Sequence, residues 1–140
     1  MALPASLLLE IVTPDRSLVR EEVDEVQVPG AEGYLGILPG HTPLLSTLTV
    51  GELWFRTGLA KQHLAIVGGF VEVLADRVTV LAQIAERAED IDVTRAEAAR
   101  RRAEERLARP SPDFNIERAR VALLRSLIRL QVATRPRTRA

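Results

Sequence analysis

Hydrophobic and polar residues alternate along the first 85 residues of the chain. Leu7, Leu9 and Ile11 occupy alternate positions, and Leu53 and Phe55 repeat this spacing further along. Because successive side chains of a strand point to opposite faces of a sheet, this period of two predicts half-buried β-strands. Turn-forming residues divide the region at Pro14-Asp15, Pro29-Gly30, Gly58, Gly68-Gly69 and Ala75-Asp76-Arg77. Short strands separated by turns, with no helix between them, indicate an antiparallel sandwich or barrel.

The period changes near Asp92, where a first helix is predicted to begin. The Asp92 carboxylate can accept a backbone N–H of the first turn, and residues 93–109 are mainly Ala, Glu and Arg, which favour helices. The apolar positions of this helix are Ala96, Ala99, Ala103 and Leu107. Alanine buries little area, so the packing of this helix is predicted to be weak. The composition leaves two interpretations open, a movable switch element or a lid that lies against the sheet.

A second helix is predicted after a short connection. Pro110 and Pro112 end the first helix, because proline cannot continue one. Asp113 or Asn115 can cap the second helix, which is predicted to run to about Thr134. Its apolar positions are Ile116, Ala119, Leu123, Leu127 and Leu130. A connection this short predicts an antiparallel helical hairpin.

Charge divides the chain into the same two parts. The formal net charge is zero, but residues 1–85 hold five basic and ten acidic residues, whereas residues 86–140 hold fourteen basic and nine acidic ones. Such asymmetry indicates two parts with different electrostatic roles.

With no cysteine and only His41 and His63 as histidines, neither a thiolate zinc site nor a histidine metal cluster is expected. No apolar run approaches the roughly 20 residues that span a bilayer.

Three motifs resemble the epsilon subunits of bacterial F-type ATP synthases. They are Gly33-Tyr34-Leu35-Gly36-Ile37-Leu38-Pro39-Gly40-His41-Thr42-Pro43-Leu44-Leu45, Val67-Gly68-Gly69-Phe70-Val71-Glu72-Val73-Leu74 and Val78-Thr79-Val80-Leu81-Ala82. The order of parts, a β region and then an Ala- and Arg-rich helical hairpin, is similar as well. The resemblance implies a mainly β plus α fold: a ten-stranded antiparallel β-sandwich over residues 1–85, a linker over 86–91 and a regulatory antiparallel two-helix hairpin over 92–140.

The resemblance also implies a non-catalytic rotor subunit and its partners. The sandwich is expected to dock on the gamma shaft and the c-ring, and the hairpin is expected to swing out toward the alpha and beta catalytic subunits and restrain ATP hydrolysis. The expected location is the cytoplasmic side of the cell membrane, where the subunit is held peripherally through the complex. By analogy the c-ring contact falls on Glu32, Gly33 and His41. Alternatively, the glycine serves only the turn and His41 merely packs.

A nucleotide motif lies at the start of the hairpin. Ile91-Asp92-Val93-Thr94-Arg95-Ala96 resembles the Ile/Leu-Asp-x-x-Arg-Ala motif of epsilon subunits that bind ATP. No cofactor is required by the family, and ATP would be a regulatory ligand. Carried over by position, the resemblance places the ATP site on Glu86, Ile91, Asp92, Arg95, Ala96, Arg102, Arg125 and Arg129.

The spacing of these arginines is compatible with phosphate binding. Arg95 and Arg102 are seven residues apart and Arg125 and Arg129 are four apart, so each pair shares one helix face. Four guanidinium groups could converge on a triphosphate when the hairpin closes, each donating parallel hydrogen bonds. With 14 arginines in 55 residues, however, such spacings also arise by chance on solvated faces. A rotor subunit without nucleotide sensing, whose hairpin responds only to proteins, therefore remains the alternative.

Two other classes of protein fit less well. For an enzyme, His41 lacks a nucleophile motif and Gly68-Gly69 lacks a Walker lysine, so no catalytic residue is predicted. For a nucleic-acid binder, the arginine runs at 100–102 and 135–139 are suggestive. The basic half has one aromatic residue, Phe114, and nine acidic residues, so no nucleic-acid partner is expected.

Overall fold

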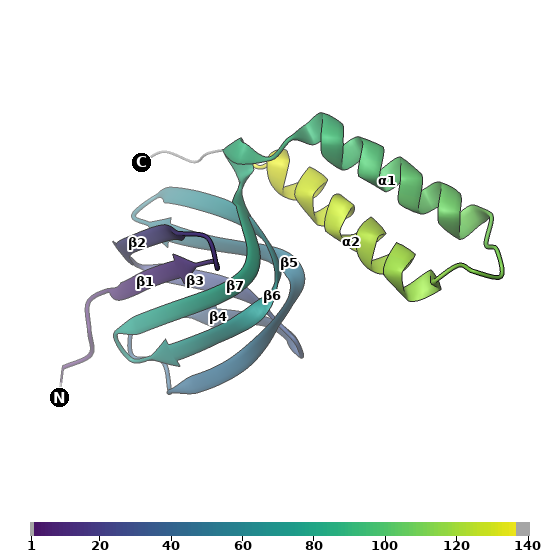
Figure 1. Ribbon diagram of the computed structural model, residues 1–140. Coiled ribbons are helices and arrows are strands. Elements are labelled where there is room, and N and C mark those ends of the chain that lie inside the picture. Colours follow the sequence, from purple (N-terminus) through teal and green to yellow (C-terminus); the bar gives the residue numbers. More distant parts are fainter. Residues whose placement is uncertain (1, 137–140) are drawn as a thin grey trace.

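Seven strands form one continuous sheet in the N-terminal part of the computed structural model, which describes residues 2–136. The predicted ranges also included residues 1 and 137–140, which lie outside the described residues, as do Arg137 and Arg139 of the terminal arginine run. The strands are β1 (Leu7–Val12), β2 (Ser17–Val23), β3 (Glu25–Gly30), β4 (Gly33–Ile37), β5 (Leu44–Thr57), β6 (Ala60–Leu74) and β7 (Arg77–Arg87). Their order in the sheet is β2-β1-β7-β6-β5-β3-β4 (Figure 1).

The sheet is antiparallel except at one pair. β1 runs parallel to β7, with Leu9 opposite Val78 and Ile11 opposite Val80. The expectation of a purely antiparallel sheet was wrong at this point. A parallel pair needs a long crossover connection, and here the whole of β2 to β6 supplies it, so local alternation gives no sign of the pairing.

The count of ten strands was also wrong, because two strands are long and bent. β5 has 14 residues and β6 has 15, and both curve from one side of the sandwich to the other (Figure 1). β6 passes through Gly68 and Gly69, at φ +70° and +122°, and keeps the same register with β7 on both sides of Gly68, which itself has no partner in that pairing. A Cβ at Gly69 would lie 2.0 Å from the carbonyl oxygen of Leu81. These glycines therefore bend a strand that the sequence pattern seemed to divide.

A single aliphatic core fills the sandwich. The predicted inward residues Leu7, Leu9, Ile11, Leu53 and Phe55 are all buried and belong to one cluster to which every strand contributes. The period of two was therefore a correct guide to the core faces. Among the described residues, Phe55 is the single aromatic side chain in this core, and the other members are aliphatic.

Three helical segments follow the sheet. They are the short 3-10 segment η1 (Ala88–Asp90), α1 (Val93–Ala108) and α2 (Ile116–Ala133). Asp92 caps α1 as predicted, accepting the Arg95 N–H at 3.0 Å. Of the two candidates for α2, Asn115 is the cap, accepting the Arg118 N–H at 3.1 Å. β7 extends through Arg87, two residues beyond the predicted end of the sheet region.

The helices pack as the predicted antiparallel hairpin through small side chains. The buried interface residues are Ala96 and Ala103 on α1 and Ala119 and Ser126 on α2. Ser126 satisfies its hydroxyl by donating to the Leu123 carbonyl at 2.8 Å. Both pairs are spaced by seven residues, which keeps each on one helix face and lets the backbones approach closely.

The hairpin meets the sandwich at one end only and projects away from it (Figure 1). The C-terminal end of α2 lies against β5, β6 and η1. A small apolar cluster of Ala65, Ile91 and Val132 forms this junction, flanked by Ala88, Ile128 and Ala133. The hairpin therefore does not cover the sheet as a lid, and little apolar area holds it in place.

Candidate functional site: the hinge of the hairpin and the open faces of the sandwich

A hollow of about 240 Å³ lies at the hinge where β7, α1 and α2 meet. It is lined by Glu86, Asp90, Asp92, Arg95, Ala96 and Arg129. Five of these six residues belong to the predicted ATP site, and they come from three separate elements. Asp90 is the additional residue, and it belongs to no motif that would have singled it out.

The polar groups of this hollow are held in defined positions. Arg129 Nε donates to Glu86 Oε1 at 2.5 Å, and both side chains are 28% exposed. This is a charge-assisted bond between α2 and β7, partly shielded from water. Asp92 is occupied by capping α1, which fixes the position of Arg95 on the first turn. The hinge hollow is therefore lined by the three carboxylates of Glu86, Asp90 and Asp92 and by cationic groups from both helices.

Three predicted residues do not line the hinge hollow. Ile91 is buried and packs against Ala65 and Val132, so it anchors the hinge instead. Arg102 is exposed on α1, about 10 Å further along the helix than Arg95. Arg125 lies one turn before Arg129 and borders a separate hollow on the outside of α2.

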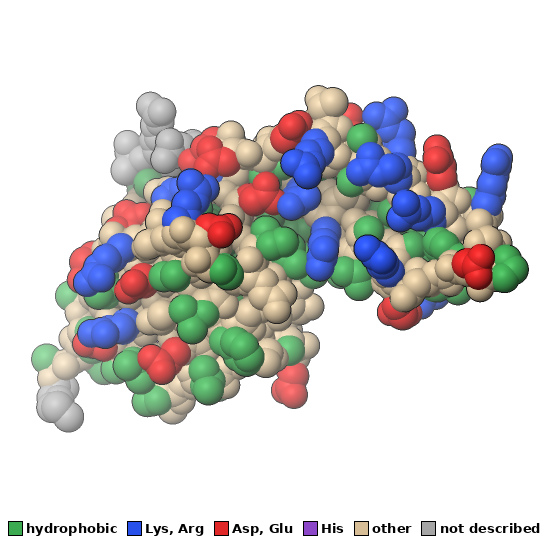
Figure 2. All heavy atoms as spheres, in the orientation of Figure 1, with side chains coloured by type: hydrophobic (Ala, Val, Ile, Leu, Met, Phe, Trp, Pro, Cys, Tyr) green, Lys and Arg blue, Asp and Glu red, His purple; other side chains and the backbone are tan. Residues whose placement is uncertain are grey.

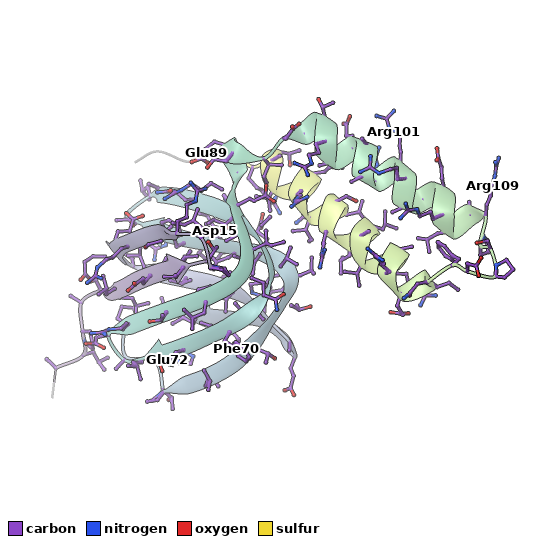
Figure 3. The ribbon with its side chains drawn as sticks, viewed as in Figure 1. Asp15, Phe70, Glu72, Glu89, Arg101 and Arg109 are labelled. Atoms are coloured by element: carbon purple, nitrogen blue, oxygen red, sulfur yellow. The ribbon has the colours of Figure 1, made fainter. Side chains whose placement is uncertain are left out.

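Most of the remaining arginines are solvated. Figure 2 shows the basic side chains spread over the hairpin, and Figure 3 shows Arg101 and Arg109 pointing from α1 away from α2. Arg100 pairs with Glu104 and Arg120 with Glu117 along the helix surface. For Arg101, Arg109 and Arg120 the solvated interpretation holds, whereas the Nε of Arg100 is buried.

A second charged contact joins the hairpin to the sandwich. Arg135, just after α2, donates from Nε to Glu52 Oε2 of β5 at 3.0 Å. The Glu52 side chain is only 9% exposed, and His63 Nδ1 lies 3.5 Å from the same oxygen. Burial lowers the pKa of His63, and Lys61 and Arg135 lower it further, against the opposing effect of Glu52. Sequence pattern alone does not reveal this contact, because it depends on the strand register and on where α2 ends.

The residues predicted to touch the c-ring lie in two loops. Glu32 precedes β4 in the β3–β4 turn and Gly33 begins β4, and both border an open hollow of about 540 Å³ together with residues 44–47. His41 lies in the β4–β5 loop, where its Nδ1 is 2.7 Å from the Thr42 carbonyl oxygen. The structure therefore brings Glu32 and Gly33 together but leaves His41 outside this hollow.

An apolar face is open on the sandwich. Phe70 and Leu81 lie opposite each other on β6 and β7, and they are 50% and 53% exposed. Figure 3 shows Phe70 and Glu72 on this face, and Figure 2 shows hydrophobic side chains gathered over it. Large exposed side chains side by side are typical of an interaction surface.

Family models match both parts of the chain. Residues 6–88 match the ATP synthase delta/epsilon chain beta-sandwich domain, and residues 89–134 match the ATP synthase delta/epsilon chain long alpha-helix domain. The chain belongs to the ATP synthase delta/epsilon family. The division between the two matched regions falls within η1, at the hinge described above.

Bacterial relatives in this family are similar over nearly their whole length. The ATP synthase epsilon chain of Solibacter usitatus is 50% identical over 131 residues, which is 94% of this chain and 98% of that protein. The epsilon chain of Syntrophobacter fumaroxidans is 53% identical over 125 residues, covering 89% and 93%. The resemblance to epsilon subunits drawn from the three motifs is confirmed, and the chain is a non-catalytic subunit of ATP synthase.

Solved structures show the same fold. A chain of the Euglena gracilis mitochondrial ATP synthase, in a structure of OSCP, F1 and c-ring in rotational state 1, aligns with a TM-score of 0.79 and 26% identity. The alignment covers 89% of this chain and 79% of that one. A chain from the Tetrahymena thermophila mitochondrial central stalk and c-ring aligns with a TM-score of 0.58 at 15% identity. Within residues 2–136, neither α1 nor α2 is long and apolar enough to cross a membrane.

Proposed function

We propose that the chain is the central-stalk rotor subunit of a proton-translocating F-type ATP synthase, and that its hairpin regulates ATP hydrolysis in response to ATP. The sandwich docks on the gamma shaft and the c-ring, and the undocked hairpin reaches the alpha and beta catalytic subunits. The subunit is held peripherally on the cytoplasmic side of the cell membrane through the complex. The epsilon-chain relatives and the c-ring in the Euglena structure support this assignment.

The two open faces of the sandwich support two docking roles. The Phe70–Leu81 face on β6 and β7 is apolar and extended, which suits permanent contact with the gamma shaft. The β3–β4 turn with Glu32 and Gly33 lies at an end of the sheet and presents backbone and one carboxylate, which suits the polar loops of a c-ring. His41 would take part only if its loop moved toward this turn.

The hinge hollow is the observation that carries the regulatory part of the proposal. It is built from a strand residue, Glu86, and from Arg95 and Arg129 on the two helices. A ligand bound here contacts all three elements at once, so it favours the docked hairpin over any arrangement in which they separate. Such differential affinity shifts the population toward the docked state.

ATP has the chemistry that this arrangement recognises. The carboxylates that line the hollow can accept hydrogen bonds from the adenine amino group, and the triphosphate can extend along the helices toward Arg102 and Arg125. A hollow of about 240 Å³ is smaller than the roughly 300–1,000 Å³ of most ligand pockets. The nucleotide would therefore be partly exposed, and we expect modest affinity suited to sensing abundant ATP.

Calorimetric titration of the isolated chain with ATP tests the nucleotide site. We expect saturable one-to-one binding, weakened at least about tenfold in Arg95→Ala, which loses a cationic group of the hinge hollow, and to a smaller extent in Arg125→Ala, which lies one turn beyond that hollow. Arg120→Ala is the matched control, since Arg120 is exposed on α2 and pairs only with Glu117 among the described contacts. Binding to the control should equal that of the wild type.

Absence of heat at millimolar ATP would overturn the nucleotide site. The rotor assignment would then stand with the hairpin responding only to its protein partners. Equal binding by the wild type and Arg95→Ala would show that ATP binds elsewhere.

A further inference from the structure

The docked hairpin is fastened to the sandwich by two parallel ion pairs. Glu52, Ala65 and Glu86 lie in register across β5, β6 and β7, so they form one row on the same face of the sheet. The end of α2 lies over this row. Arg129 pairs with Glu86 at one side of Ala65, and Arg135 pairs with Glu52 at the other.

The Glu52 pair differs from the Glu86 pair in its surroundings. Glu52 is among the most buried charged side chains of residues 2–136, at 9% exposed, and a buried carboxylate needs a cation. Two basic groups lie beside it, because Arg135 Nε and His63 Nδ1 are 3.0 and 3.5 Å from the same Oε2 atom, and the histidine becomes a second cation only when it is protonated. His63 Nδ1 itself is buried and has no hydrogen-bond partner. In the docked state Arg135 is therefore bonded to the Glu52 carboxylate, and His63 lies next to the same carboxylate without a hydrogen bond to it.

Lys61, Glu89 and Arg87 are the other charged groups around His63. Lys61, on the same strand, lies over the Trp54 ring at 3.7 Å from its centre. Glu89 of η1 lines the same small hollow of about 130 Å³ as Lys61, His63 and Arg135. On β7, Arg87 donates to the side chain of Gln62, the residue next to His63, and to the Leu18 carbonyl.

We propose that Glu52, Arg135 and His63 form a pH-sensitive latch: Arg135 holds the hairpin on Glu52, and protonation of His63 takes over the carboxylate and releases the hairpin. The inference rests on the mobility of the hairpin in the proposed function. The latch makes docking of the hairpin depend on pH as well as on ATP, through residues other than those of the hinge hollow. The latch needs no ligand other than a proton.

Proton linkage sets the direction of the effect. In the docked state the pKa of His63 is lowered, first by burial and then by Lys61 and Arg135. Undocking removes Arg135 and the cover of α2 but leaves Glu52 beside the ring, so the pKa of His63 rises. The undocked state therefore binds more protons, and docking weakens as the pH falls through the undocked pKa of His63. The docked state keeps its full stability above that pKa.

A distance measurement in the full chain tests the latch. Because the chain has no cysteine, Ser17→Cys on β2 and Ser111→Cys at the hairpin tip give two unique labelling positions for spin labels. We expect one narrow distribution of label distances at about pH 8 and a broadened, shifted distribution at about pH 5.5, a range that brackets the ordinary histidine pKa. The intrinsic fluorescence of Trp54, the single tryptophan and the strand partner of His63, should change with the same midpoint.

Three variants in this labelled chain make the test specific. His63→Gln should abolish the pH dependence, whereas His41→Gln, which changes the other histidine, should leave it intact. Arg135→Gln should broaden and shift the distance distribution already at about pH 8, because it removes the latch without involving the histidine. An unchanged pH midpoint in His63→Gln would overturn the proposal.

Proton titration of His63 by NMR gives a second readout that does not depend on undocking being complete. Its pKa should rise in Arg135→Gln relative to the wild type, and an equal or lower pKa would overturn the latch. Addition of ATP at about pH 8 separates this proposal from the proposed function. If the label distance responds to ATP but not to pH, the latch is overturned and the proposed function stands. If the distance responds neither to ATP, nor to pH, nor to Arg135→Gln, the mobile hairpin is overturned as well.

Discussion

At the scale of single residues, a few positions are determined by backbone geometry and not by chemistry. Gly68 and Gly69 are the clearest, because both have positive φ and both lie where β6 bends. They belong to one of the motifs that carry the resemblance to epsilon subunits. Their role in the structure is to let one long strand serve both sides of the sandwich.

Gly69→Ala should destabilise the sandwich by about 3 kcal/mol or more, as measured by urea unfolding. The added Cβ would lie 2.0 Å from the Leu81 carbonyl oxygen at a φ of +122°, so the strand must move as well as adopt a strained conformation. Gly36→Ala is the control, because nothing lies within 4 Å of its Cβ position. It should change stability by less than about 1 kcal/mol, and equal losses for the two variants would contradict the account.

Single-residue features were predicted correctly where they depend on neighbouring residues in the sequence. The caps at Asp92 and Asn115 follow from side-chain acceptors placed before helix-forming runs, and both are present. Prediction failed where the cause was distant. Glu52 and His63 read as ordinary outward positions on strands, and only the end of α2, far along the chain, buries them.

At the scale of elements, the hairpin combines tight packing with weak attachment. Its helices meet through Ala96, Ala103, Ala119 and Ser126, so the backbones lie close together, but its junction with the sandwich is a cluster of a few side chains. The predicted hairpin and its alanine stripe followed from composition and helical period. The direction in which it projects did not, because that direction depends on the ion pairs at the hinge.

Ala103→Leu should separate the two helices. A buried alanine at this interface leaves no room for three further carbon atoms, and overpacking costs about 1–3 kcal/mol. Loss of helical circular dichroism on heating should occur at a lower temperature than in the wild type. Ala108→Leu, exposed in the last turn of α1, should leave that temperature nearly unchanged, and the same shift in both variants would contradict close helix packing.

The strand count shows a limit of periodicity at this scale. A turn-forming pair between apolar segments marks a break in most chains, and Ala75-Asp76 is one, between β6 and β7. Gly68-Gly69 gives the same sequence signal, yet the strand skips only Gly68 and resumes in the same register with both neighbouring strands. Sequence pattern alone does not separate a bend from a break, because the two differ only in the partner strands on either side.

At the scale of the whole molecule, charge and shape fall into the two parts that the sequence composition indicated. The sandwich is acidic with an apolar open face, and the basic hairpin projects from one end of it. The proposed rotor subunit needs both features: a surface that binds its partners tightly and a helical hairpin that can change position. The two Glu–Arg pairs and the hinge hollow lie at the point where these parts join, so the proposed ATP site and the proposed latch would act on the same motion.

ATP hydrolysis by the reconstituted catalytic head, with and without this chain, tests the central claim most directly. With the wild-type chain we predict slower hydrolysis at low ATP and convergence with the chain-free rate at high ATP, because ATP at the hinge keeps the hairpin docked. With Arg95→Ala the slow rate should persist to higher ATP, and Arg120→Ala should follow the wild type. Equal rates with and without the chain at every ATP concentration, or an Arg95→Ala curve that coincides with the wild type, would contradict regulation by an ATP-responsive hairpin.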